Sequence, residues 1–305
     1  MPTGVLGIGD FQIVALIKNI ARPVFRLMVR FGQFLLSALF CALKILLPED
    51  FYLRARAYIA DKACTECSIG GIKFHINHPI SYFRAREYLK VEPDLIQWIE
   101  DTVDKDSVFY DVGANIGAYS IYVAKKGGRV VAFEPFADNY GLLNKNISIN
   151  NLDGLISAFN IAVHDKTGTD VLFVSKFDPG GAIHTVAVNR GGSAFEEYRT
   201  VHHQSVLTFR LDDFVNGSDL PFPTHVKIDV DGNDHLVLDG MDGFMTDKRL
   251  KHIAIEVNPA LRDIDRKIPT VMEKYGFQQI TDKRYDNPRA LSSQRAFNTY
   301  YKRVD

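Results

Sequence analysis

The stretch that decides the fold is Ser107-Val-Phe-Tyr-Asp-Val-Gly-Ala-Asn-Ile-Gly117, followed by an amphipathic span and then Arg129-Val-Val-Ala-Phe-Glu-Pro135. Residues 108–112 form an apolar and aromatic run that is too short for a helix. The run ends at Gly113 and Gly117, and a helical pattern begins immediately after the second glycine. We therefore predict a strand, a tight loop and a helix.

A nucleoside-binding site is the first function that this pattern indicates. Glycines in such a loop let the backbone approach a ligand closely, and the free amides of the following helix point toward it. A second predicted strand, Val130–Phe133, ends on Glu134, which lies 21 residues beyond Gly113. An acid at this position accepts hydrogen bonds from the ribose hydroxyls of a nucleoside. The alternative is an ordinary strand-turn-helix without a ligand, which the spacing of Glu134 disfavours.

The residues of the loop separate two cofactors. A dinucleotide site has the pattern Gly-x-Gly-x-x-Gly, so that a pyrophosphate can sit on the helix N-terminus. Here Asp111 precedes the loop and Asn115 stands where the middle glycine would be. An acid beside the loop repels a pyrophosphate and suits a cationic ligand. The loop therefore favours S-adenosylmethionine, which carries an ammonium and a sulfonium, over NAD.

A cluster of acids follows two later strands of the predicted sheet. We predict a strand over Val226–Val230, so Asp229 and Asp231 project to the same side if the strand persists. A further strand, from His252, ends in Glu256 and Asn258. Since parallel strands end at one edge of the sheet, we expect these side chains to converge at the rim of the cofactor pocket.

Two mechanisms suit such a cluster. A carboxylate, Asp229 or Glu256, accepts the proton of an acceptor hydroxyl, and close like charges raise the pKa of an acid toward the value that a general base needs. Alternatively, the carboxylates hold a divalent metal ion that activates the hydroxyl. We favour the metal-independent mechanism, with Asp229, Glu256 and Asp231 as the catalytic residues.

The chain resembles a known family through four blocks in family order, which are Asp111–Gly117, Phe133–Pro135, Asn146–Asn150 and Lys227–Gly232. These blocks are similar to those of the FkbM family of S-adenosylmethionine-dependent methyltransferases, over roughly residues 71–302. The resemblance implies an α/β, Rossmann-like class I methyltransferase fold with a mainly parallel seven-stranded sheet and helices on both faces. It also implies O-methylation of a hydroxyl on a sugar, polyketide or similar small molecule. The chain departs from the family at Asp231, where the motif usually has a glutamate.

Besides the glycine loop and Glu134, two further places in this fold are expected to contact the cofactor. The predicted third strand, 156–163, brings Asn160 and Ala162 to the adenine edge. The family also uses the segment before the first strand to roof the cofactor, and Tyr82, Phe83 and Arg84 are the candidates there. The full set of expected cofactor contacts is Asp111, Gly113, Ala114, Asn115, Gly117, Glu134, Pro135, Asn160, Ala162 and Asp229.

Composition limits the other functions. A formal net charge of -1 gives no overall attraction to nucleic acid, so we expect no nucleic-acid partner. The three cysteines suit a reducing compartment rather than a disulfide framework. Cys64 and Cys67 have half of a zinc-site spacing, and His75 and His78 lie near them, but we expect ordinary thiols and no metal site.

The N-terminal region differs from the rest of the chain. Basic residues recur every fourth position on one predicted helix, at Lys18, Arg22, Arg26 and Arg30, and the mostly apolar stretch 31–47 follows. We expect residues 13–47 to associate with a membrane surface as an amphipathic anchor. Packing in a homo-oligomer or on the enzyme is the main alternative, and a membrane span or a cleaved segment is a weaker one.

The sequence thus predicts an N-terminal helical region, 1–67, and a methyltransferase domain, 68–305. The expected activity is O-methylation of a sugar or glycan, glycolipid or small metabolite, in the cytoplasm or on the inner face of the membrane. The rival hypotheses are an NAD-dependent oxidoreductase and a non-catalytic membrane-attached scaffold. The acceptor is expected to bind under the insertion 178–205, which contains His184, His202 and His203 as solvated loop residues, with Tyr285 and Arg289 as further contacts.

Overall fold

The computed structural model describes residues 27–28, 30–182, 185–186, 200–257, 267–282 and 296–304. The chain divides into two compact units, Met1–Cys64 and Thr65–Asp305, and each is described by itself. The predicted division after residue 67 stays a prediction. Seven of the residues singled out above lie outside the described residues, namely Lys18, Arg22, Arg26, His184, Asn258, Tyr285 and Arg289.

The first unit consists of helices in its described part. Residues 30–46 are helical, and Pro48 separates this helix from α2 (Glu49–Ala63). Proline removes a backbone donor and so favours a break between two helices. Among the described helices, none combines the length and the hydropathy that crossing a bilayer would require.

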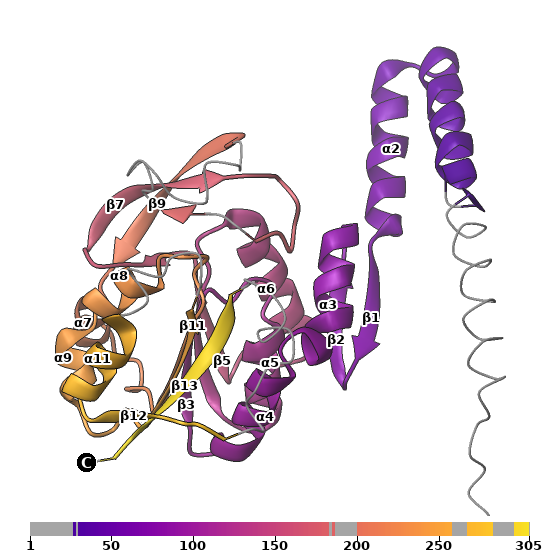
Figure 1. Cartoon of the computed structure of the whole chain (residues 1–305). Helices are drawn as coiled ribbons and strands as arrows, with labels where there is room; N and C mark the ends of the chain where they lie inside the picture. The colour runs from indigo at the N-terminus through magenta and orange to yellow at the C-terminus, as the bar shows by residue number, and fades with distance from the viewer. Residues whose placement is uncertain are drawn as a thin grey trace, which may run out of the picture. The chain divides into compact units, whose positions relative to one another are not determined.

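The second unit is built on a seven-stranded sheet with the order β12-β13-β11-β10-β3-β4-β5 (Figure 1). Strands β5, β4, β3, β10 and β11 are parallel, and β13 runs antiparallel to β11 and β12. The strands are β3 (Val108–Val112), β4 (Arg129–Phe133), β5 (Ile156–Phe159), β10 (His225–Ile228), β11 (His252–Val257), β12 (Phe277–Gln279) and β13 (Phe297–Arg303). The mainly parallel seven-stranded sheet that the resemblance implied is thus confirmed.

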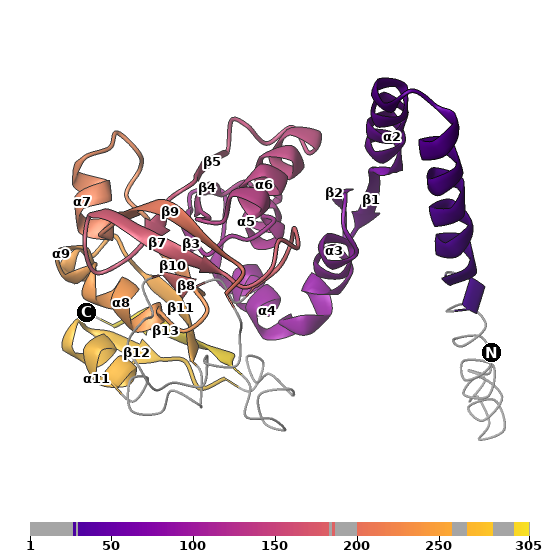
Figure 2. The same ribbon diagram turned by 90° about the horizontal axis from the view of Figure 1, so that it is seen from above.

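Helices cover both faces of this sheet (Figures 1 and 2). Side chains alternate along each strand, so Phe109 packs into one core and its neighbour Tyr110 into the other. The helices of the first face are α4 (Pro93–Thr102), α5 (Ala118–Lys125) and α6 (Ala137–Ile149). Those of the second face are α7 (Leu211–Asn216), α8 (Asp234–Asp239), α9 (Asp242–Thr246) and α11 (Lys267–Lys274).

A hairpin and a helix precede the first strand of the sheet. Strands β1 (Thr65–Ile69) and β2 (Ile72–Ile76) pair antiparallel, and α3 (Pro79–Val91) follows them. Asn146 of α6 links this hairpin to the glycine loop, since its Oδ1 accepts from the amide of His75 at 2.7 Å and its Nδ2 donates to the carbonyl of Ile116 at 2.8 Å. The asparagine block of the sequence therefore holds the lead-in segment beside the loop.

A smaller sheet, of order β6-β9-β7-β8, lies above the carboxyl edge of the large one in Figure 1. Its strands are β6 (Ala162–Val163), β7 (Gly168–Val174), β8 (Thr185–Val186) and β9 (His202–Phe209). The prediction of a single strand over 156–163 was wrong, because the chain leaves the large sheet at Asn160 and β6 pairs with β9. His202 and His203 lie on β9, opposite Val174 and Phe173, and not in a loop.

Candidate active site

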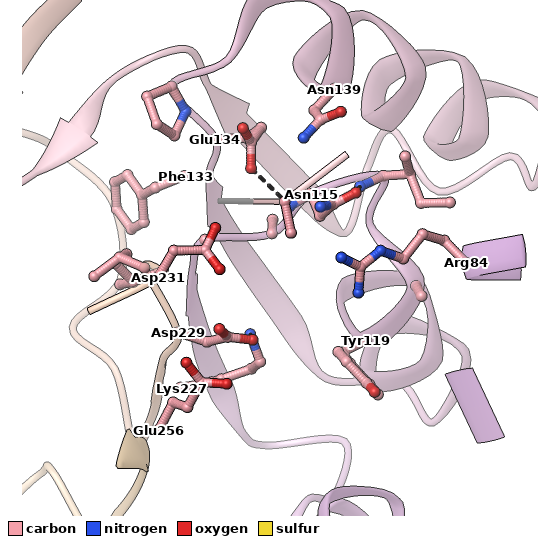
Figure 3. Close-up of a pocket in the computed structure, with 18 of the residues that line it drawn as sticks. Arg84, Asn115, Tyr119, Phe133, Glu134, Asn139, Lys227, Asp229, Asp231 and Glu256 are labelled. Carbon is pink, nitrogen blue, oxygen red and sulfur yellow. Dashed lines mark hydrogen bonds and ion pairs between the residues drawn. The ribbon is translucent and has the colours of Figure 1, made fainter. Parts of the chain in front are cut away.

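A cavity of about 440 Å³ opens at the carboxyl ends of β3, β4, β10 and β11 (Figure 3). This volume falls in the range of small-molecule and cofactor sites. Its walls come from the loop after β3, the end of β4, the segment after β5, the turn after β10 and helix α3. The cavity therefore lies where an open parallel sheet places its ligands.

The loop after β3 needs its glycines for two reasons. Gly113 and Gly117 have φ angles of 86° and 84°, in the left-handed region that side chains disfavour. A Cβ on Gly113 would lie 1.8 Å from the carbonyl oxygen of Asp229, and one on Gly117 would lie 2.3 Å from Cδ1 of Leu143. The loop thus passes directly over the end of β10, which a larger residue at 113 would prevent.

Glu134 lines the cavity and is only 5% exposed. One carboxylate oxygen accepts from the amide of Asn115 at 2.8 Å, and the other accepts from the amide of Phe136 at 2.9 Å. Burial raises the pKa of Glu134 to about 7, while these amide donors act in the opposite direction. The acid is therefore held rigidly beside the glycine loop, with its remaining lone pairs available to a ligand.

A buried lysine organises the acids at the end of β10. The Nζ of Lys227 lies 3.0 Å from Oδ2 of Asp229 and 3.5 Å from Oδ1 of Asp111. Burial alone would lower the pKa of Lys227, but the charges of Asp229, Asp111 and Glu92 outweigh it and raise that pKa above its ordinary value. Lys227 is therefore charged and fixes the carboxylate of Asp229 at the cavity wall.

The expected continuation of β10 through Asp231 was wrong. The strand ends at Ile228, and Asp231 has a φ of 53°, so the chain turns there. Buried Asp234 stabilises the turn, because its carboxylate oxygens accept from the amides of Val230 and Gly232, each at 3.1 Å. Both Asp229 and Asp231 nevertheless line the cavity.

Glu256 lies near Asp229 and Asp231 on the same side of the cavity (Figure 3). Burial, followed by the negative charges of Asp229, Asp234 and Asp231, raises its pKa well above the ordinary value of a glutamate. An acid in this environment holds a proton strongly once it has accepted one.

Sequence reasoning did not find Glu92 or Tyr119, which also line the cavity. The hydroxyl of Tyr119 donates to one oxygen of Glu92, and Nδ2 of Asn298 donates to the other oxygen at 2.6 Å. These residues come from the α3–α4 junction, from α5 and from β13, so only the folded chain brings them together. The sequence signal for Glu92 is an acid immediately before Pro93, a pattern typical of a helix start.

A short segment with two glycines closes one side of the cavity. The carbonyl of Gly181 accepts from Nδ2 of Asn115 at 2.9 Å and from Nδ2 of Asn139 at 3.1 Å. The carbonyl of Gly180 accepts from Nε of Arg84 at 3.0 Å. The first residues of the insertion 178–205 are therefore bound to the glycine loop, to α6 and to α3.

Most of the expected cofactor contacts line the cavity, namely Gly113, Ala114, Asn115, Glu134, Pro135, Ala162 and Asp229. Three of them do not reach it. Asp111 is fully buried between Ser120, whose hydroxyl donates to it at 2.6 Å, and Lys227. Gly117 is the N-cap of α5, and exposed Asn160 donates to the carbonyls of Glu134 and Pro135 at 2.8 and 3.0 Å. Their roles in this structure are to hold the loop and strand ends.

The described parts of the chain contain no group of three or more histidine, cysteine, aspartate or glutamate side chains placed to hold a metal ion. Cys64 and Cys67 are not joined in a disulfide.

The sheet order and the glycine loop define a protein of the Rossmann-like α/β class with a ligand-sized cavity at the carboxyl edge of its sheet. A model of the methyltransferase FkbM domain matches residues 111–279, which is more than half of the chain. The chain therefore belongs to the FkbM family of methyltransferases.

Curated relatives extend the similarity in different directions. The chain is 25% identical to the hexuronic acid methyltransferase AglP of Haloferax volcanii, over 73% of this chain and 86% of AglP. It is 31% identical to a tRNA (uracil(54)-C(5))-methyltransferase of Pyrococcus furiosus, over 40% of this chain but only 28% of that enzyme. Similarity to a methyltransferase thus extends over most of AglP, while the tRNA enzyme shares only a part.

Among solved structures, a methyltransferase FkbM from Methylobacillus flagellatus matches with a TM-score of 0.40 and 16% identity, over 65% of this chain and 44% of that chain. The M. jannaschii protein TYW2, solved in complex with AdoMet, matches with a TM-score of 0.42 and 14% identity, over 79% of this chain and 87% of that chain.

Replacing Lys227 by methionine should destabilise the enzyme domain strongly, because it leaves the buried carboxylate of Asp111 without its cation. We expect a loss of about 3–5 kcal/mol in the free energy of unfolding, measured by guanidinium denaturation at neutral pH. The double variant Lys227→Met, Asp111→Asn is the control, and it should recover a large part of the loss because both charges are removed. Equal stability of wild type and the single variant would show that this ion pair does not hold the site together.

Proposed function

We propose that this chain transfers the methyl group of S-adenosylmethionine to a hydroxyl oxygen of a sugar, glycolipid or similar small metabolite. The observation that carries the proposal is that the nucleoside-type acid Glu134 and the acids Asp229 and Glu256 line one cavity. AglP, whose name describes a methyltransferase acting on hexuronic acid, supports a sugar as the acceptor.

The lining of the cavity suits this cofactor. Glu134 offers a carboxylate to the ribose hydroxyls, and apolar side chains of Phe133, Ile161 and Ala162 provide a wall for the adenine. Because Gly113 has no side chain, the backbone of the loop faces the cavity directly. When bound, S-adenosylmethionine supplies a methyl group activated by a positively charged sulfur.

The acids at the rim have separate roles in the proposed reaction. Glu256 accepts the proton of the acceptor hydroxyl as the new carbon–oxygen bond forms, which suits an acid whose pKa is raised by burial and by its neighbours. Asp229, fixed by Lys227, orients the acceptor and provides negative charge near the site of transfer. Asp231, displayed by the turn, contacts the acceptor. The proposed step requires no metal ion.

Transfer to a nucleic acid is the second candidate, because several relatives act on tRNA. The described lining disfavours it. Six carboxylates line the described cavity against two strongly basic side chains, and such a lining repels a chain of phosphates. The carboxylates are Glu87, Glu92, Glu134, Asp229, Asp231 and Glu256, and the bases are Arg84 and Lys227.

We also propose that the first unit docks on an anionic membrane surface, on the cytoplasmic face where such lipids are concentrated. Its helices expose many apolar side chains, among them Phe31 at 61%, Phe34 at 67% and Ile45 at 83%. No acidic residue occurs between Phe11 and Pro48, whereas five basic residues do. Apolar area with positive charge suits anionic headgroups better than it suits an identical copy with the same charge.

The cofactor is tested by isothermal titration of the full chain with S-adenosylhomocysteine and with NAD, each with and without magnesium. We expect S-adenosylhomocysteine alone to bind, independently of magnesium, and Glu134→Ala to weaken it at least about tenfold because the ribose loses its acceptor. Glu273→Ala, a replacement of an exposed acid outside the cavity, should bind as wild type does. Binding of NAD alone, or of neither ligand, would contradict the proposal.

The base is tested by the pH dependence of kcat/KM with an acceptor found by screening sugars. The rate of wild type should rise with pH, with an apparent pKa above that of an ordinary glutamate, because Glu256 must be deprotonated to accept the proton. Glu256→Gln should lower kcat about 10²- to 10⁴-fold and lose this dependence. A wild-type pH profile in this variant would assign the base elsewhere, and Asp229→Asn would then be compared in the same assay.

Membrane docking is tested by sedimentation of the full chain with phosphatidylglycerol-containing vesicles and with neutral phosphatidylcholine vesicles. We expect the full chain to bind the anionic vesicles. The combined replacements Phe31→Ser, Phe34→Ser and Leu35→Ser should weaken this binding at least about tenfold, because they remove apolar area that the membrane would bury. Leu207→Ser, at an exposed apolar position of the second unit, is the control. A protein that stays in solution as a dimer, by light scattering, would show instead that a second copy covers these helices.

A further inference from the structure

We propose that Arg84 and Glu92, from the segment that precedes the sheet, bind the two charges at the amino-acid end of the cofactor. Arg84 takes its carboxylate and Glu92 takes its ammonium. The inference rests on the proposed cofactor. It gives a defined contact to Arg84, so far only a candidate for the roof of the cofactor, and a role to Glu92, which the sequence motifs leave without one.

Arg84 is the cation of the cavity that is still available to a ligand. The strongly basic residues of the described lining are Arg84 and Lys227. Lys227 is already paired with Asp111 and Asp229. Within the described residues, Arg84 forms no ion pair with an acid, and its Nε donates to the carbonyl of Gly180. That contact fixes the guanidinium and leaves its terminal nitrogens free to form a bidentate pair with a carboxylate.

Figure 3 shows the guanidinium of Arg84 pointing into the cavity, close to Tyr119 and across from Asp229, Asp231 and Glu256. The wall on which Arg84 lies is therefore distinct from the wall that carries the proposed base. A group bound by Arg84 does not compete with the acceptor for Glu256.

Glu92 has the complementary character. It lines the cavity, and its two oxygens accept from the hydroxyl of Tyr119 and from the amide of Asn298, which are both neutral groups. Hydrogen bonds from neutral donors fix the carboxylate without cancelling its charge. Burial and the nearby Asp229 raise the pKa of Glu92, so an ammonium in contact with it would relieve an unfavourable environment.

The two residues belong to one segment of the chain, around helix α3. Arg84 is in the middle of α3, and Glu92 caps its end and begins α4. Helix α3 is linked to the glycine loop through residues 180 and 181, because the carbonyl of Gly180 accepts from Arg84 and that of Gly181 accepts from Asn115. A zwitterion placed between Arg84 and Glu92 would therefore lie next to the loop that passes over β10.

The test compares two ligands that differ only at this end. S-adenosylhomocysteine carries the amino acid, and 5′-deoxy-5′-methylthioadenosine has the same adenosyl thioether without it. By isothermal titration of the full chain, wild type should bind the first more tightly. Arg84→Met and Glu92→Gln should each lose about 10- to 100-fold in affinity for S-adenosylhomocysteine and less than about threefold for the shorter ligand. Arg84→Lys should recover part of the preference.

Lys90→Met is the matched control, because Lys90 lies on the same helix, is exposed and does not line the cavity. It should retain the wild-type preference. A preference unchanged in Arg84→Met and Glu92→Gln would overturn the inference while leaving the cofactor intact, as would a wild type that binds the two ligands equally. Binding of neither ligand to wild type would overturn the proposed function as well.

Discussion

The ion pairs of one buried lysine determine the geometry of the whole site. Lys227 lies directly opposite Asp111 on the neighbouring parallel strand, so the ammonium and this carboxylate meet in the interior of the sheet. A buried charge is costly unless it is paired, and each of these two groups removes that cost for the other. The second partner of Lys227, Asp229, stands just beyond the end of the strand. The interior of the sheet and the rim of the cavity are therefore joined electrostatically.

This arrangement constrains the backbone around it. Because Asp229 is held at the end of β10, its carbonyl lies under the loop after β3, and only glycine fits at position 113. The same loop presents the backbone amide of Asn115 to Glu134. The side chain of Asn115 also donates to the carbonyl of Gly181, in the segment that closes one side of the cavity. The end of β10 thus positions the loop after β3, and this loop in turn positions the segment at Gly181.

The sequence was informative where chemistry is local and less so where it depends on packing. Glu134 and Asp229 follow strands and Glu256 lies near the end of β11, so the rule that parallel strands end at one edge places them without a structure. Asp111 was harder, because it lies within the strand and its direction depends on the register with Lys227. The negative charge of Asp111 is paired with Lys227 in the interior. Asp111 is therefore not the reason for a cationic ligand, although the loop lies where the sequence predicts it. Glu92 and Asn139 line the cavity and Asn298 bonds to Glu92, but these residues come from separate elements, and no spacing rule brings them together.

The acids of the cavity divide by the way each is held, and this division carries the functional argument. Asp229 is paired with a cation, Glu134 with backbone amides and Glu92 with neutral side chains, whereas Glu256 is surrounded mainly by other negative charges. A carboxylate held by a cation keeps its charge and orients its neighbours. One surrounded by like charges gains most from accepting a proton. The walls of a single cavity thus combine groups suited to binding a charged nucleoside with a group suited to receiving a proton, which is the combination that methyl transfer to a hydroxyl requires.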